Sequence, residues 1–269
     1  TCPTQELVDA FETTDGQPIL DLAKPYLDEK HMQPNYNPNN KIYDPKNPYE
    51  NRDPRLTATV LCNGDSLIWN NGEVFTVETY VNGRHGMSLD PSDRAHSRTG
   101  YYHRKLVTPQ ASNTNQINNS NWKFFRLGEI ILNYAEAAAE SGHLAEAKAA
   151  VDEIRARVNM PALPAGLSKD EMILRVHNER RVELAWEEVR YFDLRRWQKP
   201  EGNLNATCQW LTGMRITKNN DGSFNYQRYN ISTNPRGGYQ NRDLLLPLPL
   251  DEVSRLESTT GVSWQNQGW

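Results

Sequence analysis

Two neighbouring amphipathic segments, between residues 126 and 158, constrain the fold of this chain more than any other feature of its sequence. In the first segment, apolar residues recur on one face of an α-helix: Leu127, Ile130, Ile131, Tyr134 and Ala138. In the second, they recur at alternating intervals of three and four: Leu144, Ala147, Val151, Ile154 and Val158. Ser141-Gly142-His143 breaks the pattern between them, so the sequence predicts two antiparallel helices joined by a tight turn.

Small side chains are concentrated where these two helices would face each other, at Ala135, Ala137, Ala138, Ala139, Ala147, Ala149 and Ala150. They would let the two helix axes come close together. The pair is similar to one tetratricopeptide-type unit of about 34 residues. Because one such unit cannot bury both of its faces alone, we expect other helical pairs, absent from this chain, to pack beside it.

Local signals predict further helices. Thr4 can serve as the N-cap of a short helix over residues 3–11. Ser168 and Glu171 form a capping box in front of a third helix from residue 169 to about residue 186, and we expect a helical continuation over residues 191–197. A last short helix is expected over residues 251–256.

Strands are expected where β-branched and aromatic residues gather, over residues 56–62, 73–81 and 99–107. A hairpin is expected between residues 213–217 and 224–231, because Asn220-Asp221-Gly222 is a turn signal. Residues 15–55 are crowded with Pro, Asn, Asp and Gly, which predicts a long loop. The fold class is therefore α+β, mainly α, with a loop-rich C-terminal region of short strands.

Composition excludes several functions. The 269 residues carry a net charge of −4, and the arginines alternate with glutamates, so no basic stripe supports nucleic-acid binding. No apolar run approaches the roughly 20 residues that cross a bilayer. The three cysteines form no C-x-x-C pair and the six histidines no H-E-x-x-H motif, so we expect neither a metal nor another cofactor.

Carboxylates on the third helix raise the question of catalysis, because Glu179, Glu183 and Glu187 are spaced at i, i+4 and i+8. A glycosidase needs two carboxyl groups beside an open cleft, one of them with a raised pKa. Nearby arginines instead lower a carboxyl pKa. We therefore interpret these side chains as a structural ion-pair network, formed by Glu179, Arg180, Glu183, Glu187, Arg190, Asp193 and Arg196.

The same helix carries a long motif. It reads Glu179-Arg180-Arg181-Val182-Glu183-Leu184-Ala185-Trp186-Glu187-Glu188-Val189-Arg190-Tyr191-Phe192-Asp193-Leu194-Arg195-Arg196-Trp197 and resembles the signature of the SusD/RagB family. Other segments resemble that family in the same order: Pro3 to Phe11, Asn51-Arg52-Asp53-Pro54-Arg55-Leu56, Arg126-Leu127-Gly128-Glu129, Leu246-Pro247-Leu248-Pro249 and Gln265-Asn266-Gln267-Gly268-Trp269. The family usually has Gly at the position of Glu188 and Pro at that of Gln267, so the helix is expected to continue through Glu188.

The resemblance implies a SusD-like fold in which residues 1–269 are the C-terminal domain of a protein about twice as long. The missing N-terminal half would begin with a lipidated cysteine and supply the other helical pairs. The implied function is a non-catalytic lipoprotein on the extracellular face of the outer membrane. It would capture an oligosaccharide and deliver it to a SusC-like TonB-dependent transporter. The alternatives are a RagB-like peptide-capturing protein, a glycoside hydrolase and a helical-repeat scaffold for protein partners.

Aromatic rings and amides in loops are the candidate ligand contacts, because a sugar presents a flat apolar face edged by hydroxyl groups. A ring that covers about 40 Å² of sugar would contribute about 1 kcal/mol. The candidates are Trp69, Tyr80, Tyr101 and Trp122. Trp69 lies in the turn-prone segment 67–72 and Tyr80 lies near Asn82-Gly83, which favours exposure of both rings.

Overall fold

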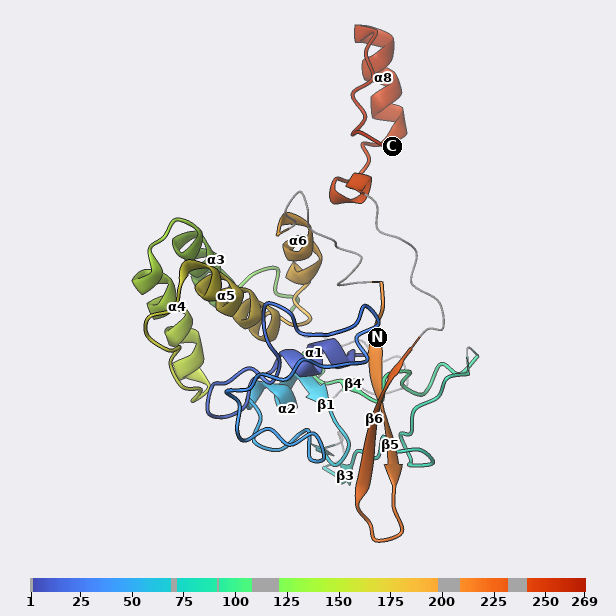
Figure 1. Ribbon diagram of the computed structural model, residues 1–269. Coiled ribbons are helices and arrows are strands. Elements are labelled where there is room, and N and C mark those ends of the chain that lie inside the picture. The colour runs from blue at the N-terminus through green and yellow to red at the C-terminus, as the bar shows by residue number, and fades with distance from the viewer. Residues whose placement is uncertain (1, 69–71, 91, 108–120, 198–208, 232–240) are drawn as a thin grey trace.

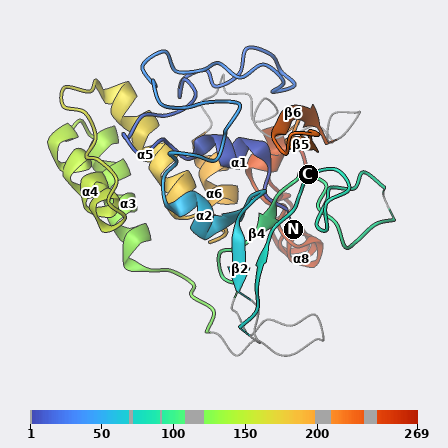
Figure 2. The same ribbon diagram turned by 90° about the horizontal axis from the view of Figure 1, so that it is seen from below.

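The structure, a computed structural model, describes residues 2–68, 72–90, 92–107, 121–197, 209–231 and 241–269. A group of helices lies on one side of the molecule and a long hairpin on the other, with the N-terminal helix between them (Figures 1 and 2). The expected class, α+β and mainly α, is confirmed, and the strands form three separate two-stranded sheets.

The helical pair is formed as the sequence predicts, by α3 (Leu127–Glu140) and α4 (Leu144–Arg157). Gly142, with φ +86°, ends α3, and the amide of His143 donates to the carbonyl of Ala138 at 2.8 Å. Five of the seven alanines are buried between the helices: Ala135, Ala138, Ala139, Ala147 and Ala150. Ala137 and Ala149 face solvent instead, so the expectation for these two residues was wrong.

Helix α5 (Lys169–Glu183) joins two apolar cores. Its capping box is present, since the Ser168 hydroxyl accepts from the amide of Glu171 and the Glu171 carboxylate accepts from the amide of Ser168. Met172 and Val176 pack in the core shared with α3 and α4, whereas Val182 packs in the core around α1 (Gln5–Ala10). The helix ends at Glu183, three residues before the predicted end.

A sharp break separates α5 from α6 (Val189–Arg196), so the expectation of a helix that continues through Glu188 was wrong. Trp186 and Glu188 both have φ +66°, which is left-handed backbone. The break turns α6 back toward α5, where the Asp193 carboxylate receives two hydrogen bonds of 3.0 Å from the Arg180 guanidinium. Local sequence patterns do not predict this tertiary contact.

The left-handed conformation gives a stability prediction for Glu188, which is exposed and makes no side-chain cap of α6. Glu188→Gly should raise the free energy of unfolding by about 0.5–1 kcal/mol, because glycine adopts positive φ without the steric cost that other residues meet. Glu188→Ala removes the same side chain but keeps the strain, and it should give no gain. Urea unfolding of the two variants and the parent measures the difference; equal stability of the Gly and Ala variants would contradict the strain argument.

The strands are shorter than predicted, except in the hairpin. Residues 56–59 of the first expected strand lie in helix α2 (Arg55–Thr59), because Pro54 favours a helical turn and the Asp53 carboxylate accepts from the Arg55 amide at 2.9 Å. The rest of that strand is β1 (Val60–Leu61), which pairs with β4 (Tyr102–His103) from the third expected strand. The second expected strand is reduced to β3 (Val74–Thr76), which pairs with β2 (Ser66–Ile68), a strand that was not predicted. The hairpin of β5 (Thr212–Lys218) and β6 (Phe224–Asn230) is confirmed.

Helix α1 is held by the hairpin. The Glu6 carboxylate accepts from the amide of Thr212 at 2.9 Å, and the Asp9 carboxylate accepts from the Arg228 guanidinium at 2.6 Å. Gly100 lets the loop before β4 cross β5 closely, where the amide of Met214 donates to the carbonyl of Thr99 at 2.9 Å. The N-terminal segment, α2 and the hairpin therefore share one core.

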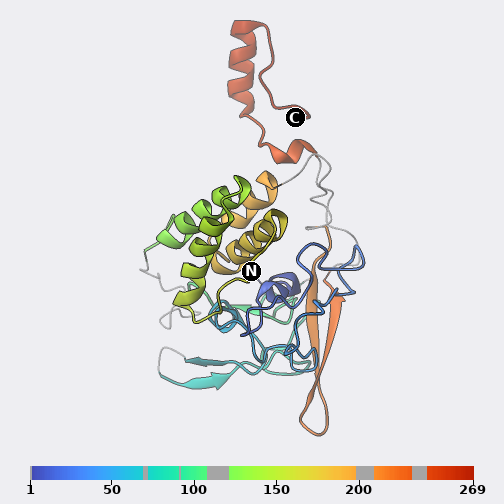
Figure 3. The same ribbon diagram turned by 60° about the vertical axis from the view of Figure 1, so that its left-hand side comes forward.

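The C-terminal region extends away from the rest of the described chain (Figures 1 and 3), to which it is connected where Arg195 of α6 donates to the carbonyl of Asp243 at 3.2 Å. It consists of a short 3₁₀ helix, η1 (Asn241–Leu244), and α8 (Leu250–Thr260), which is longer than the predicted residues 251–256. Leu250 and Trp264 are exposed there, as are Leu127 and Ile130 on α3. These apolar surfaces agree with the expectation that further helical pairs pack beside this chain, which stays a prediction. In the part of the chain that is described, no helix has the length and apolarity to cross a membrane.

Candidate functional site

The polar face of α5 lies in a group of ion pairs that we call the buried carboxylate network, formed by Glu12, Asp53, Arg55, Lys105, Arg126, Arg155, Arg157, Arg175, Glu179, Glu183 and Glu187. Glu179 and Glu183 are both buried. Arg55 from α2 donates to both of them, at 2.5 Å and 2.9 Å. Arg155 from α4 donates to the other oxygen of Glu179 at 3.1 Å.

The network continues past the end of α5. Arg157 donates to both oxygens of Glu183 at 2.7 Å, and Arg126 donates to Glu183 at 2.8 Å. The Glu187 carboxylate accepts from Arg126 at 2.7 Å and from the Lys105 ammonium at 2.5 Å. The network thus connects α2, α4, α5 and the segment before α3.

Electrostatics at Glu183 and Glu187 oppose a role for either residue as a catalytic acid. Burial raises the pKa of Glu183, but its hydrogen bonds and charge pairing with Arg55 and Arg126 outweigh burial and lower it. The pKa of Glu187 is lowered in the same way, by Arg126 and Lys105 against burial. Both carboxyl groups are therefore ionised at neutral pH, and neither can donate the proton that a glycosidase acid must supply.

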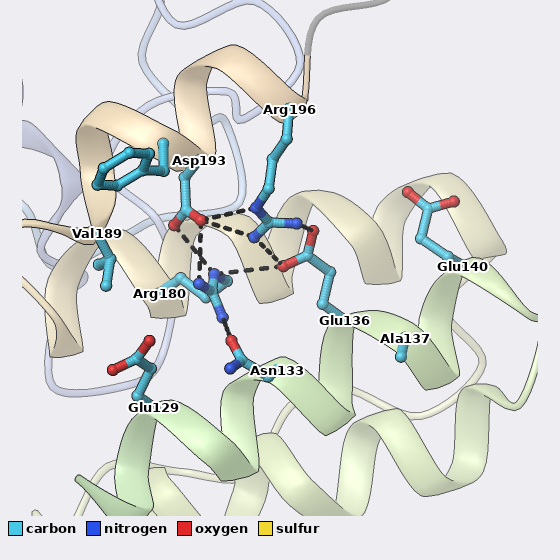
Figure 4. A pocket seen from close by; sticks show the side chains of 10 residues that line it. Glu129, Asn133, Glu136, Ala137, Glu140, Arg180, Val189, Asp193 and Arg196 are labelled. Atoms are coloured by element: carbon cyan, nitrogen blue, oxygen red, sulfur yellow. Dashed lines mark hydrogen bonds and ion pairs between the residues drawn. The ribbon is translucent and has the colours of Figure 1, made fainter. Parts of the chain in front are cut away.

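A second group of charges, the Asp193 cluster, lies between α3 and α6 and lines a cavity of 520 Å³ (Figure 4). It consists of Asn133, Glu136, Arg180, Asp193 and Arg196. Arg196 donates to both Glu136 and Asp193, and Arg180 donates to Asn133 at 2.6 Å. The acids and bases of the Asp193 cluster bind one another, so these side chains are poor candidates for holding a ligand.

The sequence motif grouped residues that the structure divides between two clusters. Glu179, Glu183 and Glu187 belong to the buried carboxylate network, whereas Arg180, Asp193 and Arg196 belong to the Asp193 cluster. The guanidinium of Arg190 lies over the Trp197 ring, 5.6 Å from its centre, and its place in a network stays a prediction.

The partners of the acids were missed by sequence reasoning. Arg55 and Arg126 lie in the short segments that resemble the SusD/RagB family, as does Asp53. Their place in these segments was the available signal, because the segments themselves are polar and do not indicate burial. No such signal exists for Arg155 and Arg157, because their positions in the sequence are typical of the polar face of a surface helix.

A cavity of 620 Å³ lies at one end of the buried carboxylate network. Its size lies within the range of about 300–1,000 Å³ that is typical of ligand pockets. The exposed side of the cavity is formed by Lys105, Leu106, Trp122, Lys123, Arg157 and Trp186. Trp122 is 56% exposed, and the indole nitrogen of Trp186 is buried without a hydrogen-bond partner among the described residues. An apolar ring therefore lies beside several hydrogen-bond donors.

The other candidate rings are not at this cavity. Tyr101 is completely buried and donates to Gln5 at 2.5 Å, so a ligand cannot reach its ring and the expectation for it is corrected. Tyr80 is half-buried at the edge of the same core, with its ring centre 5.6 Å from that of Phe224. Trp69 lies outside the described residues.

A smaller cavity of 280 Å³ lies between α1 and α5, beside Tyr26 and Trp197. The rings there are engaged, because Trp197 stacks on His177 at 3.7 Å and Tyr26 stacks on His31 at 4.3 Å. Within the described ranges, no group of three or more His, Cys, Asp or Glu side chains is placed to hold a metal ion. The 620 Å³ cavity is therefore the candidate ligand site.

Comparisons with known proteins agree with the fold and the motif. The chain aligns over its whole length with a SusD-like protein (BF3747) from Bacteroides fragilis NCTC 9343, at 29% identity and a TM-score of 0.70, and covers 47% of that protein. It aligns over its whole length with the protein BT4246, at 25% identity and a TM-score of 0.71, and covers 45% of it. The chain thus spans about half the length of these solved structures.

No curated protein sequence matches the chain. The model of the SusD family matches residues 1–269. The expectation of a SusD-like fold is confirmed, and this chain belongs to the SusD family.

Proposed function

We propose that this chain is the C-terminal domain of a surface nutrient-binding protein, and that it holds an oligosaccharide in the 620 Å³ cavity beside Trp122. Proteins of the SusD family bind glycans in nutrient uptake, work with SusC-like transporters and are associated with the outer membrane. In our proposal the intact protein is lipid-anchored on the extracellular face, releases the glycan to a TonB-dependent partner and does not hydrolyse it.

One observation carries the proposal: a half-exposed indole lines a cavity of oligosaccharide size next to cationic donors. The ring can cover the apolar face of a sugar, and the donors can bind its hydroxyl oxygens. Two or three such contacts, after the cost of association, leave a dissociation constant of about micromolar to millimolar. Binding of that strength suits a protein that must release its ligand.

Trp122→Ala should weaken glycan binding about fivefold to tenfold, because the lost stacking area is worth about 1 kcal/mol. Trp264→Ala is a matched control, since Trp264 is 57% exposed but lies beyond α8, away from the cavity. Isothermal titration calorimetry on a glycan panel measures both affinities. If both variants lost the same affinity, or if Trp122→Ala lost none, Trp122 would not be part of the ligand site.

The non-enzymatic part of the proposal rests on the lowered pKa of Glu183 and of Glu187, both of which line the cavity. Chromatography of the glycans after long incubation with pure protein should therefore show intact substrate. Products would support the glycoside hydrolase alternative instead. The same calorimetry with a peptide library separates glycan capture from peptide capture.

A further inference from the structure

We propose that the ligand of the 620 Å³ cavity is an acidic saccharide, one that carries uronate carboxylates or sulfate esters. This inference rests on the proposed function and narrows it to one ligand class. Its basis is the charge of the cavity wall, which differs in sign from that of the whole chain.

Cations outnumber acids around the cavity. Arg55 lies at its inner end and is bound to Asp53 and Glu179 as well as to Glu183. The other charged residues of the wall are four cations and two carboxylates, namely Lys105, Lys123, Arg126, Arg157, Glu183 and Glu187. An excess of two positive charges is thus concentrated in one cavity of a chain whose net charge is −4. Such a concave, single-sign region attracts anions.

The cations are also more accessible than the acids. The side chain of Glu183 is 2% exposed and that of Glu187 is 16% exposed, whereas the side chain of Arg157 is 56% exposed. Lys123 is exposed and has no ion-pair partner among the described residues. A ligand entering from solvent therefore meets ammonium and guanidinium groups, with the carboxylates behind them.

The arrangement of donors fits a saccharide better than a free anion. Trp122 and Lys123 both line this cavity, so a sugar ring stacked on the indole can present an acidic substituent to the ammonium group.

The test compares acidic saccharides with neutral partners of the same backbone, by calorimetry on the full chain. The probes are galacturonate tetramers with their methyl esters, and sulfated galactan oligosaccharides with their desulfated forms. In one pair or both, the acidic member should bind about tenfold more tightly at low salt, because its hydrogen bonds are charge-assisted. The preference should shrink as sodium chloride is raised from about 50 to 500 mM, since salt screens exposed charges.

Two variants distinguish the contribution of the Lys123 charge to binding from that of the Trp122 ring. Lys123→Gln should weaken the acidic member more than the neutral one and so reduce the preference, whereas Trp122→Ala should weaken both members by similar factors. Lys46→Gln is the control, because it removes one exposed positive charge from the loop that precedes α2, away from the cavity wall. It should change neither affinity.

The outcomes distinguish this inference from the proposed function. If no acidic member binds more tightly than its neutral partner, the inference is wrong. The proposed function still stands in that case when neutral glycans bind and Trp122→Ala weakens them. If no glycan of either kind binds, both are wrong. A preference for the acidic member that Lys123→Gln leaves intact would place the anion outside this cavity and would also overturn the inference.

Discussion

Replacing Glu183 with Gln is expected to lower the free energy of unfolding by about 3–5 kcal/mol, which is the effect of removing one member of a buried ion pair. The Glu183 carboxylate accepts hydrogen bonds from three guanidinium groups, those of Arg55, Arg126 and Arg157. Glutamine keeps the size of the side chain but removes its charge and places an amide donor against guanidinium donors. Urea unfolding at pH 7 measures the change.

Glu252→Gln is the matched control for this charge removal. Glu252 pairs with Arg255 on the surface of α8, where the side chains are 47% and 67% exposed. Exposed pairs are worth about 0.2–1 kcal/mol, so the control should stay near the parent. Equal effects of the two substitutions would show that the buried carboxylate network does not stabilise the fold. A Glu183→Gln protein that keeps its stability but loses glycan turnover would instead identify a catalytic residue.

The same substitution should change the response to acid. Because the pKa of Glu183 in the folded protein lies below its ordinary value of 4.5, the ionised carboxylate stabilises the fold above the unfolded pKa. That contribution is lost as pH falls through the folded pKa. The parent should therefore lose more stability than Glu183→Gln between about pH 5 and pH 2. Parallel stability curves for the two proteins would argue against an ionised, paired Glu183.

Gly100→Ala is expected to cost about 3 kcal/mol or more, from left-handed strain of about 1–2 kcal/mol and the rest from overlap in a packed region. Gly100 has φ +80°, and a methyl group on it would overlap the carbonyl oxygen of Met214 in β5. The added methyl group is fixed by the backbone and overlaps a main-chain carbonyl, so no side-chain rotation can relieve the overlap. The loop before β4 would have to move off the hairpin.

Gly142→Ala distinguishes the cost of left-handed backbone strain from the cost of steric overlap. Gly142 has φ +86°, but an added methyl group there would meet no atom within 4 Å. This control should cost only the conformational part, about 1 kcal/mol. Thermal and urea unfolding of the two variants give the comparison. Similar losses at both positions would mean that the packing of Gly100 against Met214 contributes nothing.

Elements set by local chemistry could be predicted from the sequence. The pair α3 and α4, the capping box of α5 and the β5–β6 hairpin all follow from residues next to one another in the chain. The helical turn of α2 was missed because residues 56–62 have the composition of a strand, while Asp53 and Pro54 fix the backbone just before them. The break at Glu188 was missed because a contact across two helices, Arg180 with Asp193, favours it.

Site residues were harder to predict the farther apart their partners lie in the sequence. The acids on α5 follow from helical spacing, but Arg55 pairs with Glu179 across 124 positions of sequence, and no period connects them. Tyr101 and Trp122 both occur among polar and turn-forming residues, yet one is completely buried and the other exposed. Tyr101 follows the close crossing of Gly100 over β5, a tertiary contact that the sequence does not reveal.

The attachment of α1 to the hairpin has a consequence for the order of events during synthesis. Glu6 and Asp9 leave the ribosome well before their partners Thr212 and Arg228, which lie 206 and 219 positions later. At about 5–20 residues per second, the first helix waits roughly 10–40 s for its partners. Val8 and Phe11 are completely buried in a core that includes Met214 and Ile216 of the hairpin, so this core is incomplete throughout that interval. Helix α1 therefore depends on protection from proteases until β6 has been made.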